Sequence, residues 1–461
     1  MADFAFATGD DLTDLGGAAA KYDANLTALS ILRELEAENR IEAIAHEQSQ
    51  LARYTGWGDS ELIKRAFPNG TYSTSLPAED LAAVTTPEEQ RALRASSINA
   101  HYTAIPVIRA IYRGLLHLGL AHVASGQGRG RRCLRVLEPA AGVGHFIGAM
   151  PEELKNKSEC AAVELDPLSA RITKLLYPSA QMFAEGFESA ELPANWFDLV
   201  ISNVPFGNYK VCDRDVSEHY LRASIHDYFF SKALRVARPG GIIAFITSRF
   251  TLDKQDARVR RYLAQHAELL ACVRLPNNAF QQCAGTQVVT DIIILRTRES
   301  SISPEAARAE KWTETVEHTV TSESGTPVGI TLNRVYAEDE SLMLGQAVIG
   351  PHGLYGRNEF TVRATEGREL ADKLSETLCR VLPASLLKSP AEMNVAATCV
   401  SVSTASTSQP DALELVVQQE LAGLSEARAS LEQARAEHLV EIYRLAKEVI
   451  RIQVDGEDDE M

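Results

Sequence analysis

Apolar side chains recur every three or four residues in several stretches of the chain, a spacing typical of amphipathic helices. The first predicted helix starts at Asn25, with apolar positions at Leu26, Leu29, Leu32, Leu35, Ile41 and Ile44. A second helix is predicted over 87–95, because Thr86 can cap it and Pro87 suits the first helical position. A third is predicted over 104–120, where Pro106 falls in the first turn and is tolerated.

Short apolar runs bounded by Gly, Pro or Asn predict buried strands in the middle of the chain. These runs lie at 134–137, 160–163, 181–183, 199–201, 242–247, 272–275 and 291–295. Helical patterns alternate with them, among them 146–154 and 225–238, and the second of these is stopped by Pro239, Gly240 and Gly241. Strands that alternate with helices predict an α/β fold, a doubly wound, Rossmann-like domain.

The remaining segments differ in composition and suggest further divisions of the chain. We predict a flexible acidic arm (1–24), a helical N-terminal region (25–95), the Rossmann-like domain (96–300), a small accessory region (301–390), a low-complexity linker (391–411), a long helix (412–454) and an acidic tail (455–461). Apolar residues in the long helix repeat mostly in threes and fours between Leu424 and Ile452. The repeat fits either a coiled coil that joins two copies or a partner subunit, or a helix packed on the body.

Composition narrows the class of protein. The chain has 461 residues, of which 45% are hydrophobic, and no apolar run reaches the length of a membrane span. The first residues lack the basic and apolar parts of a secretory signal. Seven cysteines are dispersed without a C-x-x-C pair, which favours reduced thiols in a cytoplasm and disfavours a zinc site or disulfide frame. We therefore expect a cytoplasmic protein without a membrane anchor or a bound metal.

Charge is unevenly distributed along the chain. The net charge is −16, yet residues 96–298 hold 24 Lys and Arg against 18 Asp and Glu. A basic middle with acidic flanks is compatible with a catalytic domain that faces DNA. The excess is modest, and many domains that bind no nucleic acid share it.

The predicted strand at 199–201 runs directly into a turn of unusual composition, residues 203–207. Asn203 offers a side-chain carbonyl, and Val204 offers a backbone carbonyl that the following Pro205 pushes towards extended geometry. Phe206 adds a flat apolar face. Two acceptors beside an aromatic plate can hold a flat ring that carries an exocyclic amine. The alternative interpretation is an ordinary Pro-Gly turn after a strand.

A second polar cluster follows the predicted strand at 134–137. Glu138, Ala140, Gly142 and Gly144 lie in a small-residue turn between this strand and the next helix, as in the first β-α turn of a nucleotide-binding fold. The third glycine of the dinucleotide fingerprint is missing, so a pyrophosphate is not the expected ligand. Glu164 ends the next strand, where an acid commonly accepts from both ribose hydroxyls, whereas Asp166 is better placed as a helix N-cap.

In this order, the motifs resemble those of amino-group DNA methyltransferases in the γ arrangement. They are most similar to the methylase portion of the helicase-methylase (DarB-like antirestriction) proteins of phages and mobile elements, in which Asn-Val-Pro-Phe-Gly is a usual catalytic motif. The resemblance covers roughly residues 25–390 and includes 54–58, 274–277, 285–286 and 290–292. Two departures are the absence of the helicase portion and Val204 in place of the commoner proline, which still offers a backbone carbonyl.

The resemblance implies an enzyme that transfers a methyl group from S-adenosylmethionine to N6 of adenine in DNA, in modification or antirestriction. It implies cofactor contacts from Tyr102, Thr103, Glu138, Ala140, Gly142, Gly144, Glu164, Phe187 and Glu188. Glu164 would accept from the ribose, and Phe187 would pack on the cofactor adenine. The catalytic residues would be Asn203, Val204, Pro205 and Phe206, and no metal or general base is required.

Two other functions share these motifs. A methyltransferase that acts on adenine in RNA or on glutamine in a protein uses the same turn. A non-catalytic subunit could keep the fold for binding alone, although the intact Asn203, Phe206 and Glu164 argue against it.

Overall fold

The computed structural model describes residues 2–12, 15–67, 76–97, 102–124, 133–207, 209–213, 216, 218–222, 224–280, 288–322, 325–350, 359–365, 367 and 369–387. They belong to one compact unit, 1–392. The predicted linker, long helix and acidic tail lie outside the described residues, and so do 285–286.

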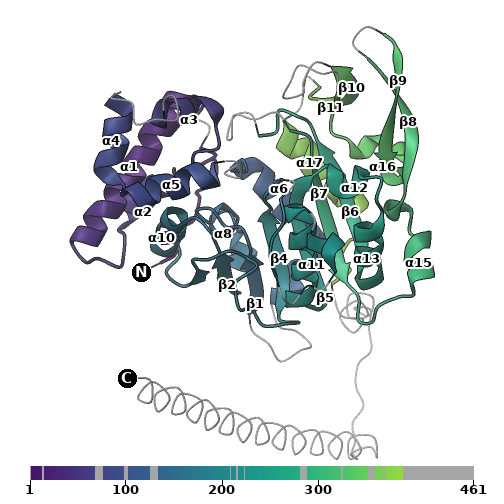
Figure 1. Ribbon diagram of the computed structural model, residues 1–461. Coiled ribbons are helices and arrows are strands. Elements are labelled where there is room, and N and C mark those ends of the chain that lie inside the picture. Colours follow the sequence, from purple (N-terminus) through teal and green to yellow (C-terminus); the bar gives the residue numbers. More distant parts are fainter. Residues whose placement is uncertain are drawn as a thin grey trace, which may run out of the picture. The chain divides into compact units, whose positions relative to one another are not determined.

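A seven-stranded sheet forms the centre of this unit (Figure 1). Its strands are β1 (Leu134–Glu138), β2 (Ser158–Val163), β3 (Gln181–Phe183), β4 (Phe197–Asn203), β5 (Ala237–Ser248), β6 (Ala267–Leu275) and β7 (Thr290–Thr297). The order across the sheet is β3-β2-β1-β4-β5-β7-β6, and the pairs from β3 to β5 are parallel. Only β7 runs antiparallel, between β5 and β6. The carboxyl ends of β1, β2, β4, β5 and β6 therefore lie at the same edge of the sheet, which we call the carboxyl edge. All seven predicted strands are confirmed.

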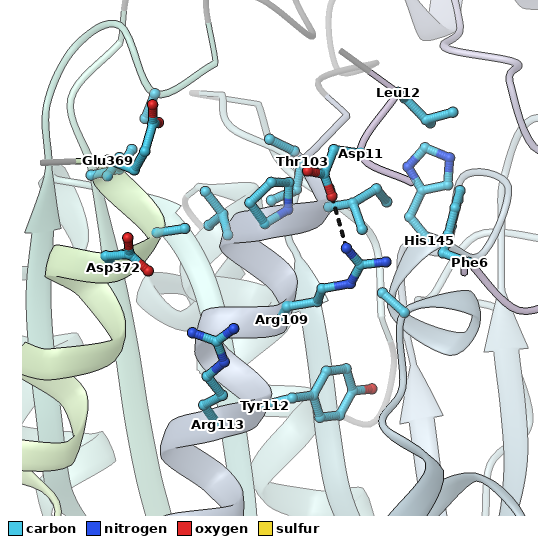
Figure 2. Close-up of a pocket in the computed structure, with 18 of the residues that line it drawn as sticks. Phe6, Asp11, Leu12, Thr103, Arg109, Tyr112, Arg113, His145, Glu369 and Asp372 are labelled. Carbon is cyan, nitrogen blue, oxygen red and sulfur yellow. Dashed lines mark hydrogen bonds and ion pairs between the residues drawn. The ribbon is translucent and has the colours of Figure 1, made fainter. Parts of the chain in front are cut away.

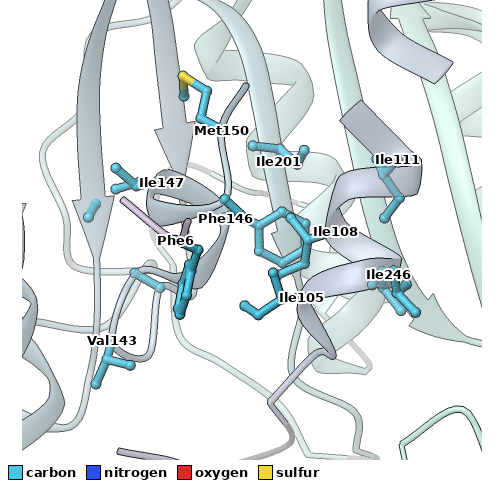
Figure 3. Packing of buried hydrophobic residues seen from close by; sticks show 14 of the residues in the cluster. Phe6, Ile105, Ile108, Ile111, Val143, Phe146, Ile147, Met150, Ile201 and Ile246 are labelled. Carbon is cyan, nitrogen blue, oxygen red and sulfur yellow. The ribbon is translucent and has the colours of Figure 1, made fainter. Parts of the chain in front are cut away.

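Each face of the sheet carries its own hydrophobic core. On one face, α6 (Ile105–Leu118) packs with α17 (Leu370–Val381), and its isoleucines lie against Ile201 of β4 and Ile246 of β5 (Figure 3). On the other face, α11 (Ile225–Val236) and α13 (Arg258–His266) cover Ile243 and Phe245. Successive strand residues point to opposite faces, so both cores require the near-continuous apolar strands that the sequence displays.

Helices of the N-terminal region pack against one another and against α10 (Pro167–Leu176). They are α1 (Ala18–Ala37), α2 (Ala45–Leu51), α3 (Ser60–Ala66), α4 (Leu76–Val84) and α5 (Pro87–Ser96). The predicted cap of α5 is confirmed, because the Thr86 side chain accepts from the Glu89 backbone N–H at 3.2 Å and the Glu89 carboxylate accepts in return from the Thr86 backbone. The helix predicted to continue to Ile44 ends instead at Ala37. Asn39 has a left-handed φ of 54°, and Ile41 and Ile44 are exposed.

Shorter elements complete the unit. The remaining described helices are α7 (Leu120–Ala124), α8 (His145–Gly148), α9 (Glu152–Lys155), α10 (Pro167–Leu176), α12 (Phe250–Asp253), α15 (Pro304–Ala309) and α16 (Arg334–Glu338). The described 3₁₀ turns are η2 (His219–Arg222), η3 (Lys311–Thr313) and η4 (Glu340–Leu342). The accessory region contributes two hairpins, β8 (Thr315–Thr321) with β9 (Pro327–Asn333), and β10 (Gln346–Gly350) with β11 (Glu359–Arg363). Among the described helices, none combines the length and apolarity that a bilayer crossing demands.

Two further predictions about local structure are wrong. The helix predicted over 146–154 is two short helices, α8 and α9, because Pro151 lacks an N–H and disfavours helical geometry in the residue before it. Strand β5 begins at Ala237, before Gly240 and Gly241, so these glycines do not separate it from α11. They accompany a register shift against β4 between Phe197 and Leu199.

The acidic N-terminal segment is not a loose arm. The Phe4 amide donates to the Leu176 carbonyl at 2.8 Å, and the Phe6 amide donates to the Gly148 carbonyl at 3.1 Å. Phe6 is buried beside α8 (Figure 3). Residues 18–24 already belong to α1. The segment therefore crosses α10 and α8 as part of the folded unit.

Candidate functional site

A cavity of about 490 Å³ opens at the carboxyl edge, where β1, β2 and β4 end. It brings together most of the residues predicted from sequence. These are Tyr102, Thr103, Glu138, Ala140, Gly142, Glu164, Phe187, Glu188, Asn203 and Pro205. Of the predicted set, Gly144, Val204 and Phe206 are not among the described residues that line it. The sheet thus gathers at one place side chains that are up to 103 positions apart in the sequence.

The turn after β1 forms the floor of the cavity. Gly142 and Gly144 have φ values of 55° and 75°, a left-handed conformation that side chains other than glycine rarely adopt. A Cβ atom at Gly142 would lie 3.1 Å from the Tyr102 ring, and one at Gly144 would lie 2.4 Å from the Tyr177 ring. Gly142 therefore keeps the floor open towards the cavity, whereas Gly144 serves the packing of α8 against α10.

Two carboxyl groups, those of Glu138 and Glu164, line the cavity near this floor. Burial raises the pKa of Glu138 well above its usual range, although the amides of Phe146 and Ile147 favour the charged form. Burial raises the pKa of Glu164 to about 7. Its two oxygens accept from the amides of Gly142 at 2.7 Å and Asp166 at 2.8 Å, and each oxygen retains a further lone pair. Glu164 is thus held with its carboxylate at the cavity and can accept hydroxyl hydrogen bonds there.

Tyr102 and Thr103 form the wall in front of α6. Burial, and next the nearby Glu164, raise the pKa of Tyr102 well above its usual value, so the phenol stays neutral. The Tyr102 ring meets His145 edge-on, with ring centres 5.2 Å apart. His145 Nε2 lies 3.2 Å from the Ala52 carbonyl, an acceptor, so this nitrogen carries the hydrogen. Burial lowers the pKa of His145 to about 4, and the imidazole is therefore neutral.

The wall opposite is apolar. Phe187 is buried against Phe229, with ring centres 4.9 Å apart, and Lys232 fixes its backbone by donating to the Phe187 and Ala190 carbonyls. Glu188 follows at the rim, half-buried. Leu165, which sequence reasoning missed, also lines the cavity although it is 68% exposed. An exposed leucine beside the Glu164 acid offers a flat ligand an apolar contact, and its position directly after that acid is the signal that could have identified it.

The predicted catalytic turn leaves β4 at the same edge. Asn203 pairs with Ile246 of β5 in the sheet, and the Val204 amide donates to the Ile246 carbonyl at 3.0 Å. Val204 is buried, so its side chain anchors the turn while Asn203 and Pro205 line the cavity. Phe206 is half-buried against the core that contains α6. Tyr209 also lines the cavity, and its ring packs against Gly207, where a Cβ atom would lie 2.7 Å away.

The N-terminal region supplies a wall that was not predicted. Tyr54, Gly56 and Trp57 line the cavity together with Ala92, Ala95 and Ser96 of α5. Trp57 Nε1 donates to the Tyr54 hydroxyl at 3.0 Å, so the two rings are fixed to each other. Residues 54–58 are among the segments that carry the family resemblance, but nothing in their spacing indicated that they would reach the ends of β1 and β2.

A second cavity, of about 1240 Å³, lies on the other side of Tyr102, Thr103 and His145, which line both. The N-terminal segment and α6 form much of its surface. There Arg109 donates to Asp11 Oδ1 at 2.7 Å, and Phe6 and His145 lie near each other (Figure 2). The centres of the Phe6 and His145 rings are 5.4 Å apart. The N-terminal segment is therefore separated from the first cavity by a single layer of side chains.

The first cavity suits S-adenosylmethionine on three observations. A Cβ atom at Gly142 would press on the Tyr102 ring, so the floor of the cavity is formed there by backbone alone. Buried polar atoms at Thr103 Oγ1 and Glu138 Oε2 have no hydrogen-bond partner among the described residues. Glu164 and Leu165 present a carboxylate and an apolar surface side by side. Together these groups match an ammonium or hydroxyl donor at one end of a ligand and a ribose with a flat base at the other.

A mostly parallel sheet in this strand order, with a glycine turn after β1 and an acid after β2, defines the class I S-adenosylmethionine-dependent methyltransferase fold. Residues 44–280, just over half of the chain, match the family described as Eco57I restriction-modification methylase. The chain belongs to this family, and S-adenosylmethionine is its cofactor.

Two curated proteins are similar to parts of the chain. The defense against restriction protein B of Escherichia phage P1 is 28% identical over 204 residues, 43% of this chain and 8% of that protein. The type II methyltransferase M.XamI of Xanthomonas campestris pv. amaranthicola is 26% identical over 190 residues, 37% of this chain and 34% of that protein. The chain thus spans well under half the length of either relative.

Among solved structures, a modification subunit of a putative type I restriction enzyme from Vibrio vulnificus is 17% identical. The alignment covers 70% of this chain and 90% of that one, with a TM-score of 0.37.

Proposed function

We propose that this protein transfers a methyl group from S-adenosylmethionine to N6 of adenine in DNA, as a modification or antirestriction methylase that works in the cytoplasm. The observation that carries the proposal is the shared cavity. Asn203 and Pro205 belong to the turn at 203–207, which we call the acceptor turn, and they line the same cavity as Gly142 and Glu164. Family membership supports DNA as the acceptor, because the family is named for restriction-modification.

On this proposal, the chain acts mainly by positioning. S-adenosylmethionine supplies a methyl group on a positively charged sulfur, which any well-aligned amine can displace. The target adenine must leave the duplex stack to reach the carboxyl edge. Asn203 and the Val204 carbonyl would accept from its amine and keep the nitrogen lone pair directed at the methyl carbon, while Phe206 would stack on the ring. No side chain has to remove a proton before the bond forms.

The cofactor residues would hold the methyl donor in line. Glu164 would accept from the ribose hydroxyls, and Tyr102 and Thr103 would contact the methionine end. Phe187 and Leu165 would enclose the cofactor base. Because Glu138 also lies between the floor and α8, it would orient the turn through the amides of Phe146 and Ile147.

The test is methyl transfer from labelled S-adenosylmethionine to unmethylated duplex DNA, with RNA and total protein as parallel acceptors. We expect label on DNA adenine, and Asn203→Ala should lower turnover by roughly 100-fold or more, because the lost hydrogen bond matters chiefly in the transition state. Cofactor affinity should stay within about twofold. Asn156→Ala, an exposed asparagine before β2, is the matched control.

Three results would contradict the proposal. Full activity of Asn203→Ala would remove the site assignment. Label on RNA or on protein alone would assign a different acceptor. Cofactor binding without transfer to any acceptor would indicate a binding subunit that keeps the fold.

A further inference from the structure

One aromatic side chain protrudes from the carboxyl edge beyond the acceptor turn. Phe250 is 49% exposed, although the rest of α12, Thr251, Leu252 and Asp253, is buried. Exposing a large apolar ring on a fixed, otherwise buried turn loses the free energy that burial would contribute, about 25 cal/mol per Å². Such a side chain is a candidate contact for a partner.

The Phe250 ring is held in place from within the fold. The Arg249 guanidinium lies over it, with Cζ 4.2 Å from the ring centre, and the same group is 5.4 Å from the Phe360 ring of β11. Arg249 Nη1 pairs with Asp253 at 3.3 Å, and Asp253 also pairs with the buried Arg274 at 2.8 Å. One face of the ring is thus fixed by an anchored cation, and the exposed remainder is available to a flat partner.

Strand pairing places Phe250 beside the acceptor turn. Asn203 pairs with Ile246, four positions before Phe250, and both segments leave the sheet at the carboxyl edge. The Arg249 amide donates to the Val289 carbonyl at 3.4 Å, which directs this segment towards β7, away from the cofactor side. The turn at 203–207 and α12 thus leave neighbouring strands at the same edge of the sheet, with Phe250 on the side away from the cofactor residues.

We propose that Phe250 stacks on a nucleobase of the acceptor DNA next to the adenine that is drawn out of the helix. The proposal rests on the proposed function. Removing one base from a duplex leaves its neighbours without a stacking partner, and an aromatic ring backed by a cation can replace that partner. On this proposal Phe250 contacts the DNA and does not contact the cofactor.

The fold offers a matched control for this test. Trp196 is 46% exposed, and Arg135 lies over its ring with Cζ 3.9 Å from the centre. Trp196 directly precedes β4 and Arg135 lies near the start of β1, so this second pair lies at the opposite edge of the same sheet. Trp196→Ala removes a comparable ring from a place that the acceptor does not approach.

The experiment measures binding of the full chain, with S-adenosylhomocysteine present, to a fluorescent pool of random-sequence duplexes, by anisotropy. Base stacking contributes about 1–3 kcal/mol, so Phe250→Ala should weaken DNA binding roughly 5- to 150-fold. Phe250→Trp should remain close to wild type, and Trp196→Ala should change the affinity by less than about twofold. Binding of S-adenosylhomocysteine and the melting temperature of Phe250→Ala should both stay near their wild-type values.

Unchanged DNA affinity in Phe250→Ala, or an equal loss in Trp196→Ala, would overturn this inference while leaving the proposed function intact. A wild-type chain that binds S-adenosylhomocysteine but no DNA would overturn the proposed acceptor, and the role of Phe250 with it. A large loss of DNA binding in Phe250→Ala alone, restored by Phe250→Trp, establishes the contact.

Discussion

The two halves of the candidate site are built differently. In the cofactor half, the Gly142 floor, Glu138 and Glu164 are set by strand ends, and backbone amides hold both carboxyl groups. In the acceptor half, Asn203 and Phe206 are half-buried and Tyr209 is exposed. A small ligand of constant shape can be enclosed by a rigid wall, whereas a macromolecular acceptor must approach from solvent. This edge of the sheet is therefore preformed on one side and open on the other.

The largest loss of ligand binding is expected from a substitution at the floor of the cofactor half. Gly142→Asp adds a side chain at a φ of 55°, against the Tyr102 ring and beside Glu164. We expect binding of S-adenosylhomocysteine to fall by roughly 100-fold or more, because strain and like-charge repulsion add to the lost space. Isothermal calorimetry on the folded variant measures this loss.

A matched control for Gly142→Asp is Gly325→Asp. Gly325 has a φ of 81° and nothing within 4 Å of an added Cβ atom, so it shares the strain without facing a ligand. Normal binding in Gly142→Asp would show that the floor does not contact the cofactor.

A smaller effect is expected at the rim of the cofactor half. Leu165→Ala should weaken S-adenosylhomocysteine binding about tenfold, because covering a leucine side chain contributes roughly 1.5 kcal/mol or more. The melting temperature of the ligand-free protein should not change, since Leu165 is largely exposed. Ile41→Ala, which removes an 84% exposed side chain outside the cavity, is the control. Equal affinities for both variants would remove Leu165 from the site.

The smallest effect concerns pH. Because burial raises the pKa of Glu164 to about 7, the ligand-free protein should lose stability as pH rises from its unfolded value, near 4.5, through 7. A hydroxyl group donates a stronger hydrogen bond to the ionised carboxylate than to the neutral acid. The affinity for S-adenosylhomocysteine should therefore rise roughly fivefold from pH 6 to pH 8. Calorimetry at several pH values measures the trend.

The Glu164→Gln variant separates the contribution of the Glu164 carboxyl group to this pH dependence from the contributions of its neighbours. Asp166, Glu138 and Tyr102 also face Glu164, and the variant leaves them in place. The pH dependence of affinity should be flat in Glu164→Gln. A slope that persists would belong to one of the neighbours.

Sequence patterns predicted the strands and the turn at 203–207 that follows β4, because both are local. Apolar runs between Gly, Pro and Asn locate buried strands, and the parallel sheet then brings their ends to one edge. For the same reason, Asp166 was correctly interpreted as the cap of α10, where its carboxylate accepts from the Ser169 amide at 2.9 Å. The order of strands across the sheet was not visible in any single stretch.

The contacts that sequence reasoning missed depend on distant partners. The N-terminal segment reads as small and acidic, yet its docking is decided by Gly148, Leu176 and Arg109, which lie more than 90 positions away. The wall formed by Tyr54 and Trp57 is a similar case, because its partners are strand ends far along the chain. Periodicity reports which face of an element is apolar and leaves open which distant element covers it.

The N-terminal segment also has a consequence for how the protein is made. Asp11 is separated from its partner Arg109 by 98 positions, and Asp3 from Ser179 by 176. At cellular rates of elongation, Ser179 is added roughly 10–35 s after Asp3. Until then Phe4 and Phe6 have no site to enter, and the layer of His145 and Tyr102 is unsupported on that side. The layer of side chains behind the candidate cofactor cavity is therefore completed late in synthesis, by a stretch of chain that was made early.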